Sequence, residues 1–473
     1  MSKGQPVTPA APLPIASVLA FASASIPIQA LVLAITVHLP RYFASHIGLE
    51  LAVVGAAFAM VRLVDIPIDV MMGVAMDRTR SRFGRYRLWL MMGAPVLMGG
   101  LYLLLRADSS TTQLGLSASL LFLYLGYSMV YLSHLAWGGV LGTSYHQRSR
   151  VFGAVIGLGV LGAVAVLIVP IIMQRLGAGE GDGVRAMVWF IIGATPVTVL
   201  LVVATTREPI TRETGAAAFR VADYWSLLRR GNVIRLLLAD LCVTLGPGWM
   251  AALYLFYFKD SRGFDTATAN LLLLIYIVAG FAGAPFAAWL ANRIGKHRSL
   301  MVTTTVYSIG LMIVPFLPAG NLLAFVPGMF VVGAMASGSL VMIRALTGDI
   351  ADEIRLENGR EWMGLMYALT IGTTKIATGL SALTFVLLQA IGYQAREHAV
   401  NTPDAIQSLQ LVFIVGPIFF VMIGGACFVG YKLTPARHAD IRRQLDERDA
   451  LHDKGPVLEI VTSESGEVAP SQS

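Results

Sequence analysis

The sequence predicts an all-α polytopic membrane protein whose twelve transmembrane helices form two pseudo-symmetric six-helix bundles. Of its 473 residues, 56% are hydrophobic and only 13% are charged, whereas about a quarter of the residues in soluble proteins are charged. Most apolar runs reach about 20 residues, the length of a spanning helix and not of a strand in an outer-membrane barrel. A basic motif recurs at the same place in each half, which indicates a duplicated unit.

Apolar runs divide the chain into two sets of six predicted helices. The first set lies at 14–39, 48–75, 87–106, 113–143, 151–175 and 185–205. The second set lies at 233–258, 266–291, 299–318, 322–346, 361–391 and 407–432. The predicted domains are an N-terminal bundle at 1–206, a cytoplasmic linker at 207–232, a C-terminal bundle at 233–432 and a cytoplasmic tail at 433–473.

The linker and the tail have distinct patterns. The linker reads AAAFRVADYWSLLRR, in which Trp225, Leu227 and Leu228 stand beside arginines. This mixture is typical of a short interfacial helix, and a solvated connector is the alternative. After Leu433 the chain reads ARHADIRRQLDERDAL, which predicts a charged helix.

Positive charge predicts the orientation in the membrane. The loops after the even-numbered helices carry most of the arginines, and loops rich in Lys and Arg face the cytoplasm. We therefore expect a multi-pass protein of the inner membrane with both termini in the cytoplasm, embedded in the lipid bilayer. The net charge of +7 gathers in these loops, so no nucleic-acid partner is expected.

Two aspartates, Asp65 and Asp69, occupy the apolar half of the stretch VRLVDIPIDVMMGVAMDRTRSRFGRYR. Residues four apart share one face of a helix, so the two carboxylates predict a paired acidic site. Charges inside the membrane are costly, and for that reason they mark functional sites by default. A buried structural ion pair is the alternative interpretation.

A loop motif occurs in both halves. After the second helix the chain reads GVAMDR and then GRYR, and after the eighth it reads NRIGKHR. The repeat resembles the cytoplasmic loop motif of the major facilitator superfamily, where forked hydrogen bonds from arginine can latch one conformation. The residues for which we expect a conformational role are Asp77, Arg78, Arg85, Arg293, Asp349 and Arg360.

Three segments resemble the glycoside-pentoside-hexuronide:cation symporters, the melibiose permease family. They are RLVDIPIDVMMG with TRSRFGRYRLWL, the loop GDIADEIRLENGREWMG between helices ten and eleven, and Lys375 within helix eleven. The resemblance implies that Asp65 and Asp69 bind the coupling cation. Helices two and eleven face each other in this superfamily, so Asp65 is the expected partner of the Lys375 ammonium.

The sugar-binding residues of that family are mostly replaced in this chain. The helix-one aspartate falls on Gln29, the helix-four aspartate on Ser133 and a helix-five arginine near Leu158, whereas Trp137 matches a family tryptophan. A site without its charged acceptors and forked arginine is not expected to transport galactosides. A neutral glycoside, an aromatic or amphiphilic metabolite and a lysolipid are the alternatives.

Polar side chains of helices four and eleven are the remaining substrate-binding candidates. On helix four, four of them lie within about a quarter of the helix circumference, where they would line a cavity: Tyr124, Tyr127, Tyr131 and His134. Packing between helices is the alternative for the tyrosines and for the threonines of helix eleven. The full set of substrate candidates is Gln29, Tyr124, Tyr127, Tyr131, Ser133, His134, Trp137 and Thr374. Asp240, in helix seven, either binds a ligand or pairs with an arginine near the cytoplasmic end.

These features favour a secondary active transporter that works by alternating access as a monomer, and not an enzyme. A P-loop and a cluster of catalytic residues at the membrane surface are both missing from the sequence, and a membrane sensor is the rival class. No cofactor or metal is expected beyond a coupling ion, H⁺ or Na⁺. Protons are favoured, because the family's sodium ligands fall on Ile68, Val130 and Ser133, of which only the serine offers an oxygen.

Overall fold

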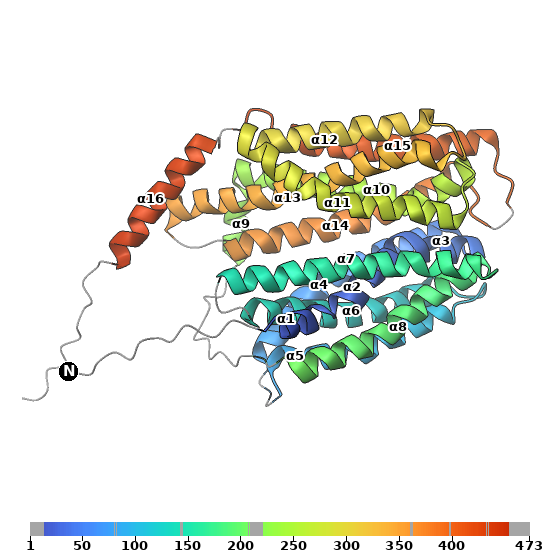
Figure 1. Cartoon of the computed structure of the whole chain (residues 1–473), viewed down its shortest axis with the longest axis horizontal. Coiled ribbons are helices and arrows are strands. Elements are labelled where there is room, and N and C mark those ends of the chain that lie inside the picture. Colours follow the sequence, from blue (N-terminus) through green and yellow to red (C-terminus); the bar gives the residue numbers. More distant parts are fainter. Residues whose placement is uncertain are drawn as a thin grey trace, which may run out of the picture.

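The protein is described here from a computed structural model (Figure 1). The structure describes residues 14–79, 81, 83–141, 145–206, 208, 221–359, 363–396, 399–431, 433 and 435–453. Within these ranges every regular element is helical. Twelve spans of the described chain are long and apolar enough to cross a membrane, which confirms the predicted fold class.

The first half begins with a broken span and continues with five regular helices. The first span joins α1 (Ile15–Ala22), α2 (Ser25–Leu33), a π-helical turn η1 (Ala34–His38), α3 (Leu39–Arg41) and a second π-helical turn η2 (Tyr42–His46). The remaining helices are α4 (Leu51–Arg78), α5 (Arg85–Leu105), α6 (Gln113–Leu141), α7 (Tyr145–Arg175) and α8 (Glu180–Thr205).

The second half contains a short helix, six spans and a terminal helix. It begins with α9 (Val221–Leu228), α10 (Gly231–Phe256), the π-helical turn η3 (Tyr257–Ser261), α11 (Thr266–Ile294), α12 (Lys296–Ile313) and the 3₁₀ turn η4 (Val314–Phe316). It continues with α13 (Leu322–Asn358), α14 (Met363–Ala390), α15 (Pro403–Ala426) and α16 (Pro435–Asp453).

The sequence predicted a loop between helices ten and eleven. This prediction is wrong over most of the segment, because α13 continues to Asn358. The added turns are amphipathic, and they bury Ile350, Ala351 and Ile354 in a cluster with Ile441 and Leu445 of α16. Apolar contact on one face therefore stabilises a helix whose other face is charged. The linker helix expected as one alternative is present as α9, and its Leu227 lies in the same cluster.

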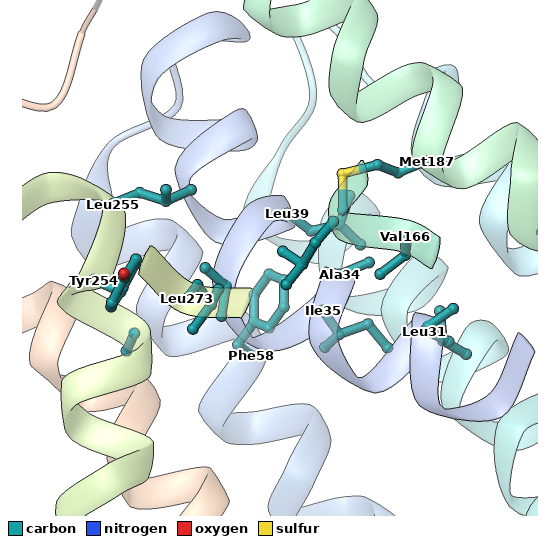
Figure 2. Packing of buried hydrophobic residues seen from close by; sticks show 14 of the residues in the cluster. Leu31, Ala34, Ile35, Leu39, Phe58, Val166, Met187, Tyr254, Leu255 and Leu273 are labelled. Carbon is teal, nitrogen blue, oxygen red and sulfur yellow. The ribbon is translucent and has the colours of Figure 1, made fainter. Parts of the chain in front are cut away.

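The two halves lie side by side, with α7 and α14 near the boundary between them (Figure 1). We call the end of the molecule that carries α9 and α16 the terminal end, and the other end, which carries η2 and η3, the far end. One apolar core is continuous across the halves. Figure 2 shows Leu31 and Ile35 of the first span on the side of Val166, and Phe58 of α4 on the side of Leu273 from α11.

The sequence repeat has a structural counterpart at the terminal end. Gly84 immediately precedes α5 with φ 102°, and Gly295 immediately precedes α12 with φ 90°. Both glycines follow the second helix of their half, where the chain reverses direction. Because side chains rarely tolerate this left-handed region, the repeated glycine reflects a backbone requirement shared by the two halves.

Candidate functional site

The two carboxylates of α4 face α14 in the other half of the protein. Lys375 Nζ donates a hydrogen bond of 2.7 Å to Oδ2 of Asp65, which is the contact expected from the sequence, and it also bonds to Oδ2 of Asp69. The spacing of four residues explains why one ammonium reaches both acids. Asp65 is 1% exposed, so this ion pair lies away from solvent between the halves.

Two further side chains surround Asp65. Ser128 of α6 donates to its Oδ1 at 3.1 Å. Nη1 of Arg62 lies 3.6 Å from its Oδ2, and this guanidinium also stacks over the ring of Tyr124 at 4.5 Å. Two cations and two carboxylates therefore balance within the cluster. Sequence reasoning missed Arg62, although its position three residues before Asp65 places it on the same helix face.

A small cavity of about 20 Å³, enough for about one water molecule, adjoins this cluster on the side of the far end. Arg62 and Tyr124 line it from the first half, and Thr378 and Ser381 line it from α14. Its other walls are mainly apolar and aromatic. The cavity therefore has a mixed polar and apolar lining but is too small to hold a sugar-like solute in this conformation.

The tyrosines of α6 form a continuous row, as their spacing predicted. Tyr124 meets Tyr127 edge-on with ring centroids 6.4 Å apart, and Tyr127 stacks on Tyr131 at 5.5 Å. Tyr131 lies within electrostatic range of Asp69 and of Arg344 in the other half. The row thus leads from the cavity toward the terminal end.

The other substrate candidates of the first half have different surroundings. His134 Nε2 lies 2.9 Å from the carbonyl oxygen of Phe21, and its ring stacks on that phenyl group. Trp137 packs edge-on against the same Phe21. Ser133 donates to the carbonyl of Met129 in its own helix, at 2.6 Å. The contacts described for these three residues are all made to other groups of the first half.

Gln29, the candidate on α2, is exposed, and its side chain lies beside Gly159 of α7. The contacts that we describe do not join it to the carboxylate cluster. Its proposed contact with substrate therefore stays a prediction.

A second charged cluster lies within the other half. Asp240 of α10 is fully buried and accepts hydrogen bonds from Thr373 and Thr374 of α14. Arg344 of α13 lies 3.9 Å from Asp240 and donates to Oγ1 of Thr374 at 3.3 Å. Of the two alternatives stated for Asp240, the structure places an arginine nearby, but at a distance longer than a hydrogen bond. Sequence reasoning did not single out Arg344, because a lone arginine in α13 shows no partner until the helices pack.

The candidates for a conformational role gather at the terminal end. Glu208 accepts hydrogen bonds from the backbone N–H groups of Arg85, Tyr86 and Arg87, at 2.9–3.1 Å, and so caps the first turn of α5. The negative charge suits the positive end of a helix dipole. Arg78 is the exposed last residue of α4.

The corresponding candidates of the second half are Arg293 and Asp349. Arg293 lies over the ring of Trp289 at 4.7 Å. Asp349 pairs with Lys296 of α12 and lies 3.3 Å from His438 of α16. Arg360 and the side chain of Asp77 lie outside the part of the chain that the structure describes.

Polar contacts between the halves gather at the far end. Arg41 of α3 donates two hydrogen bonds to Asp260 of η3, at 3.1 and 3.3 Å, and Tyr393 donates to the same carboxylate. Lys259 of η3 pairs with Glu180 of α8. Ion pairs and hydrogen bonds therefore join the two halves at the far end.

The geometry above agrees with comparisons to known proteins. The profile of the family described as MFS/sugar transport protein matches residues 20–435. The chain is 24% identical to the glucuronide carrier protein homolog of Escherichia coli (strain K12), over 86% of this chain and 90% of the relative. It is 22% identical to the isoprimeverose transporter of Lactiplantibacillus pentosus, over 89% of each.

Solved structures show the same fold. The nucleoside transporter NupG matches with a TM-score of 0.63 at 13% sequence identity, over 88% of this chain and 99% of that chain. At this identity the likeness concerns the arrangement of helices alone.

Proposed function

Because the chain belongs to the MFS/sugar transport protein family, we propose that it is a secondary transporter that couples a cation to a small sugar-like solute. The match also confirms its place among the glycoside-pentoside-hexuronide:cation symporters. The observation that carries the proposal is the contact of Lys375 with Asp65 and Asp69. This contact joins the halves that must separate in alternating access.

The ion pair provides a mechanism for coupling. A cation that binds to Asp65 or Asp69 neutralises part of the negative charge that attracts the Lys375 ammonium. The ammonium is then released, and the contact between α4 and α14 weakens. Since a ligand shifts a conformational equilibrium only through its different affinity for the two states, this competition supplies the required difference.

The proposed coupling ion is the proton. Sodium prefers several oxygen ligands, whereas the space between the two carboxylates is occupied by Lys375 Nζ. Ser128 contributes one hydroxyl oxygen beside Asp65, and the sequence pattern did not predict this ligand. Oδ1 of Asp69 is buried and lacks a hydrogen-bond partner among the described residues. A proton binds to a single oxygen and, unlike sodium, requires no set of further oxygen ligands.

The proposed orientation places the terminal end in the cytoplasm. The arginine-rich loops lie at this end, in agreement with the charge rule. The far-end contacts then close the protein toward the outside of an inner membrane. Substrate would reach the tyrosine row from the cytoplasm in this conformation, and from outside in the alternate one.

Uptake driven by a single imposed gradient tests the proposal. Purified protein in proteoliposomes is given labelled isoprimeverose, glucuronate and a panel of glycosides, first with a pH gradient without sodium and then with a sodium gradient at equal pH. We expect accumulation with the pH gradient alone. Accumulation with sodium alone would overturn the proton assignment, and uptake that equilibrates without accumulation would overturn coupling itself.

A further inference from the structure

The cluster formed by Asp240, Arg344, Thr373 and Thr374 is not used by the coupling mechanism above. Its carboxylate is fully buried, and its Oδ1 has no hydrogen-bond partner among the described residues. Arg344 lies 3.9 Å from that oxygen, beyond hydrogen-bond distance. A buried acid thus has a nearby cation that does not bond to it.

Arg344 is the more accessible member of this pair. Its side chain is 34% exposed, and both of its described contacts are made by Nη2. Arginine presents five donors in a planar fork that matches a carboxylate. Nε and Nη1 are therefore available to a ligand, as far as the described residues show.

The cluster faces the region between the halves. Thr374 precedes Lys375, so consecutive residues of α14 contact the acids of the second half and of the first. Tyr131, from the first half, lies within electrostatic range of Arg344. Asp69, Tyr131, Asp240 and Lys375 each lie about three turns from the terminal end of their helices, and thus at a similar depth.

The two clusters differ in how accessible their arginines are. In the first, Lys375 bonds to both carboxylates. Arg62 is only 12% exposed and lies 3.6 Å from Asp65, and its buried Nε has no hydrogen-bond partner among the described residues. In the second, threonine hydroxyls hold Asp240, and Arg344 keeps donors for another partner. Arg344 is therefore the more exposed of the two arginines, at 34% against 12%, and it keeps donors for a ligand.

We propose that Arg344 recognises a carboxylate of the transported solute, with Asp240 as its counter-ion in the empty site. The inference rests on the proposed function and narrows the solute to a carboxylate-bearing sugar-like compound. The planar guanidinium fork of Arg344 matches the two oxygens of a carboxylate, whereas a phosphate dianion would need more positive charge. The tyrosine row is placed to stack on the remainder of the solute.

Binding to detergent-purified protein tests this assignment without any need for transport. The probes are matched pairs that differ in one carboxylate: glucuronate and glucose, galacturonate and galactose, and 4-nitrophenyl β-D-glucuronide and glucoside. Thermal shift identifies the pair that binds, and calorimetry gives its dissociation constant. We expect at least one acid to bind more tightly than its neutral partner.

Variants separate recognition from structural support. Arg344→Gln should weaken binding of the acid by at least about tenfold, the scale of a charge-assisted hydrogen bond, and should leave the neutral partner nearly unchanged. Asp240→Asn keeps the contacts to threonine and removes the competing charge, so it should tighten acid binding. The double variant Arg344→Gln/Asp240→Asn removes both charges together. If the single Arg344 variant does not fold, the double variant still measures the loss of acid binding.

The matched control is Arg106→Gln, an exposed arginine at the far end. It should bind every probe as the wild type does. The proposal is overturned if no acid stabilises the wild type, if acid binding survives loss of Arg344, or if Asp240→Asn weakens it. Failure of ion-driven uptake in proteoliposomes would instead count against the proposed function.

Discussion

Nζ of Lys375 lies 2.7 Å from Oδ2 of Asp65, although 310 positions separate the two residues in the chain. The contact joins α4 of the first half to α14 of the second. A charge pair within the membrane is costly to separate, because neither partner finds water there. The charge state of the Lys375–Asp65 pair therefore affects whether the two halves stay together.

Asp65→Asn is expected to abolish accumulation of solute while the protein remains folded in the membrane. The amide keeps the shape of the side chain and its contact with Ser128, but it cannot gain and lose a proton or hold a cation. Gradient-driven uptake in vesicles, normalised to the amount of folded protein, measures the effect. Accumulation at the wild-type level would contradict a coupling role.

Lys375→Gln is expected to lower stability by about 3–5 kcal/mol, the cost of leaving buried carboxylates without their partner. Adding Asp65→Asn should recover part of that loss, because one unpaired charge is removed. Thermal unfolding of the wild type, both single variants and the double variant completes the cycle. Strictly additive losses would mean that the two side chains do not stabilise each other.

Asp260→Asn is expected to open the far end more often. The change removes the charge that holds Arg41 and Tyr393, and hydrogen bonds to charged groups contribute about 1.5–3 kcal/mol each. In a background with Cys242 and Cys427 replaced by serine, labelling of Ser381→Cys by an impermeant maleimide reports the opening. We expect labelling to be faster by about tenfold, a shift of roughly 1.4 kcal/mol.

The control for this measurement is Asp108→Asn, in an exposed turn outside the contacts between the halves. It removes the same charge and should leave labelling unchanged. Equal rates in Asp260→Asn and in the control would show that the Arg41–Asp260 pair does not hold the far end closed.

Gly84→Ala is expected to destabilise the protein by about 1–3 kcal/mol, because its φ of 102° is strained for a residue with a side chain. The added Cβ would also collide with Oε2 of Glu208, which caps α5. Gly193→Ala, in the middle of α8 with open space around it, is the matched control. Unfolding temperatures compare the two, and equal values would argue against a special role for the Gly84 backbone.

Helix positions and the pairing of Lys375 with Asp65 were predictable from sequence for physical reasons. Apolar runs must match the thickness of a bilayer, and an ammonium inside one helix requires an acid on another. The end of helix ten was not predictable in this way. Its final turns are charged, and they are helical because Ile350 and Ile354 pack against α16, a contact between distant segments.

The sequence by itself determined the membrane class, the twelve spans, the repeated loop motif and the pair of acids on one face of α4, since each follows from local periodicity, charge or sequence repetition. Only the tertiary structure decided which polar groups meet. It placed Arg62 against Asp65 and Tyr124, turned His134 and Trp137 toward Phe21, and brought Arg344 beside Asp240. Local patterns fix the face on which a side chain lies, whereas the partner across that face depends on how distant helices pack.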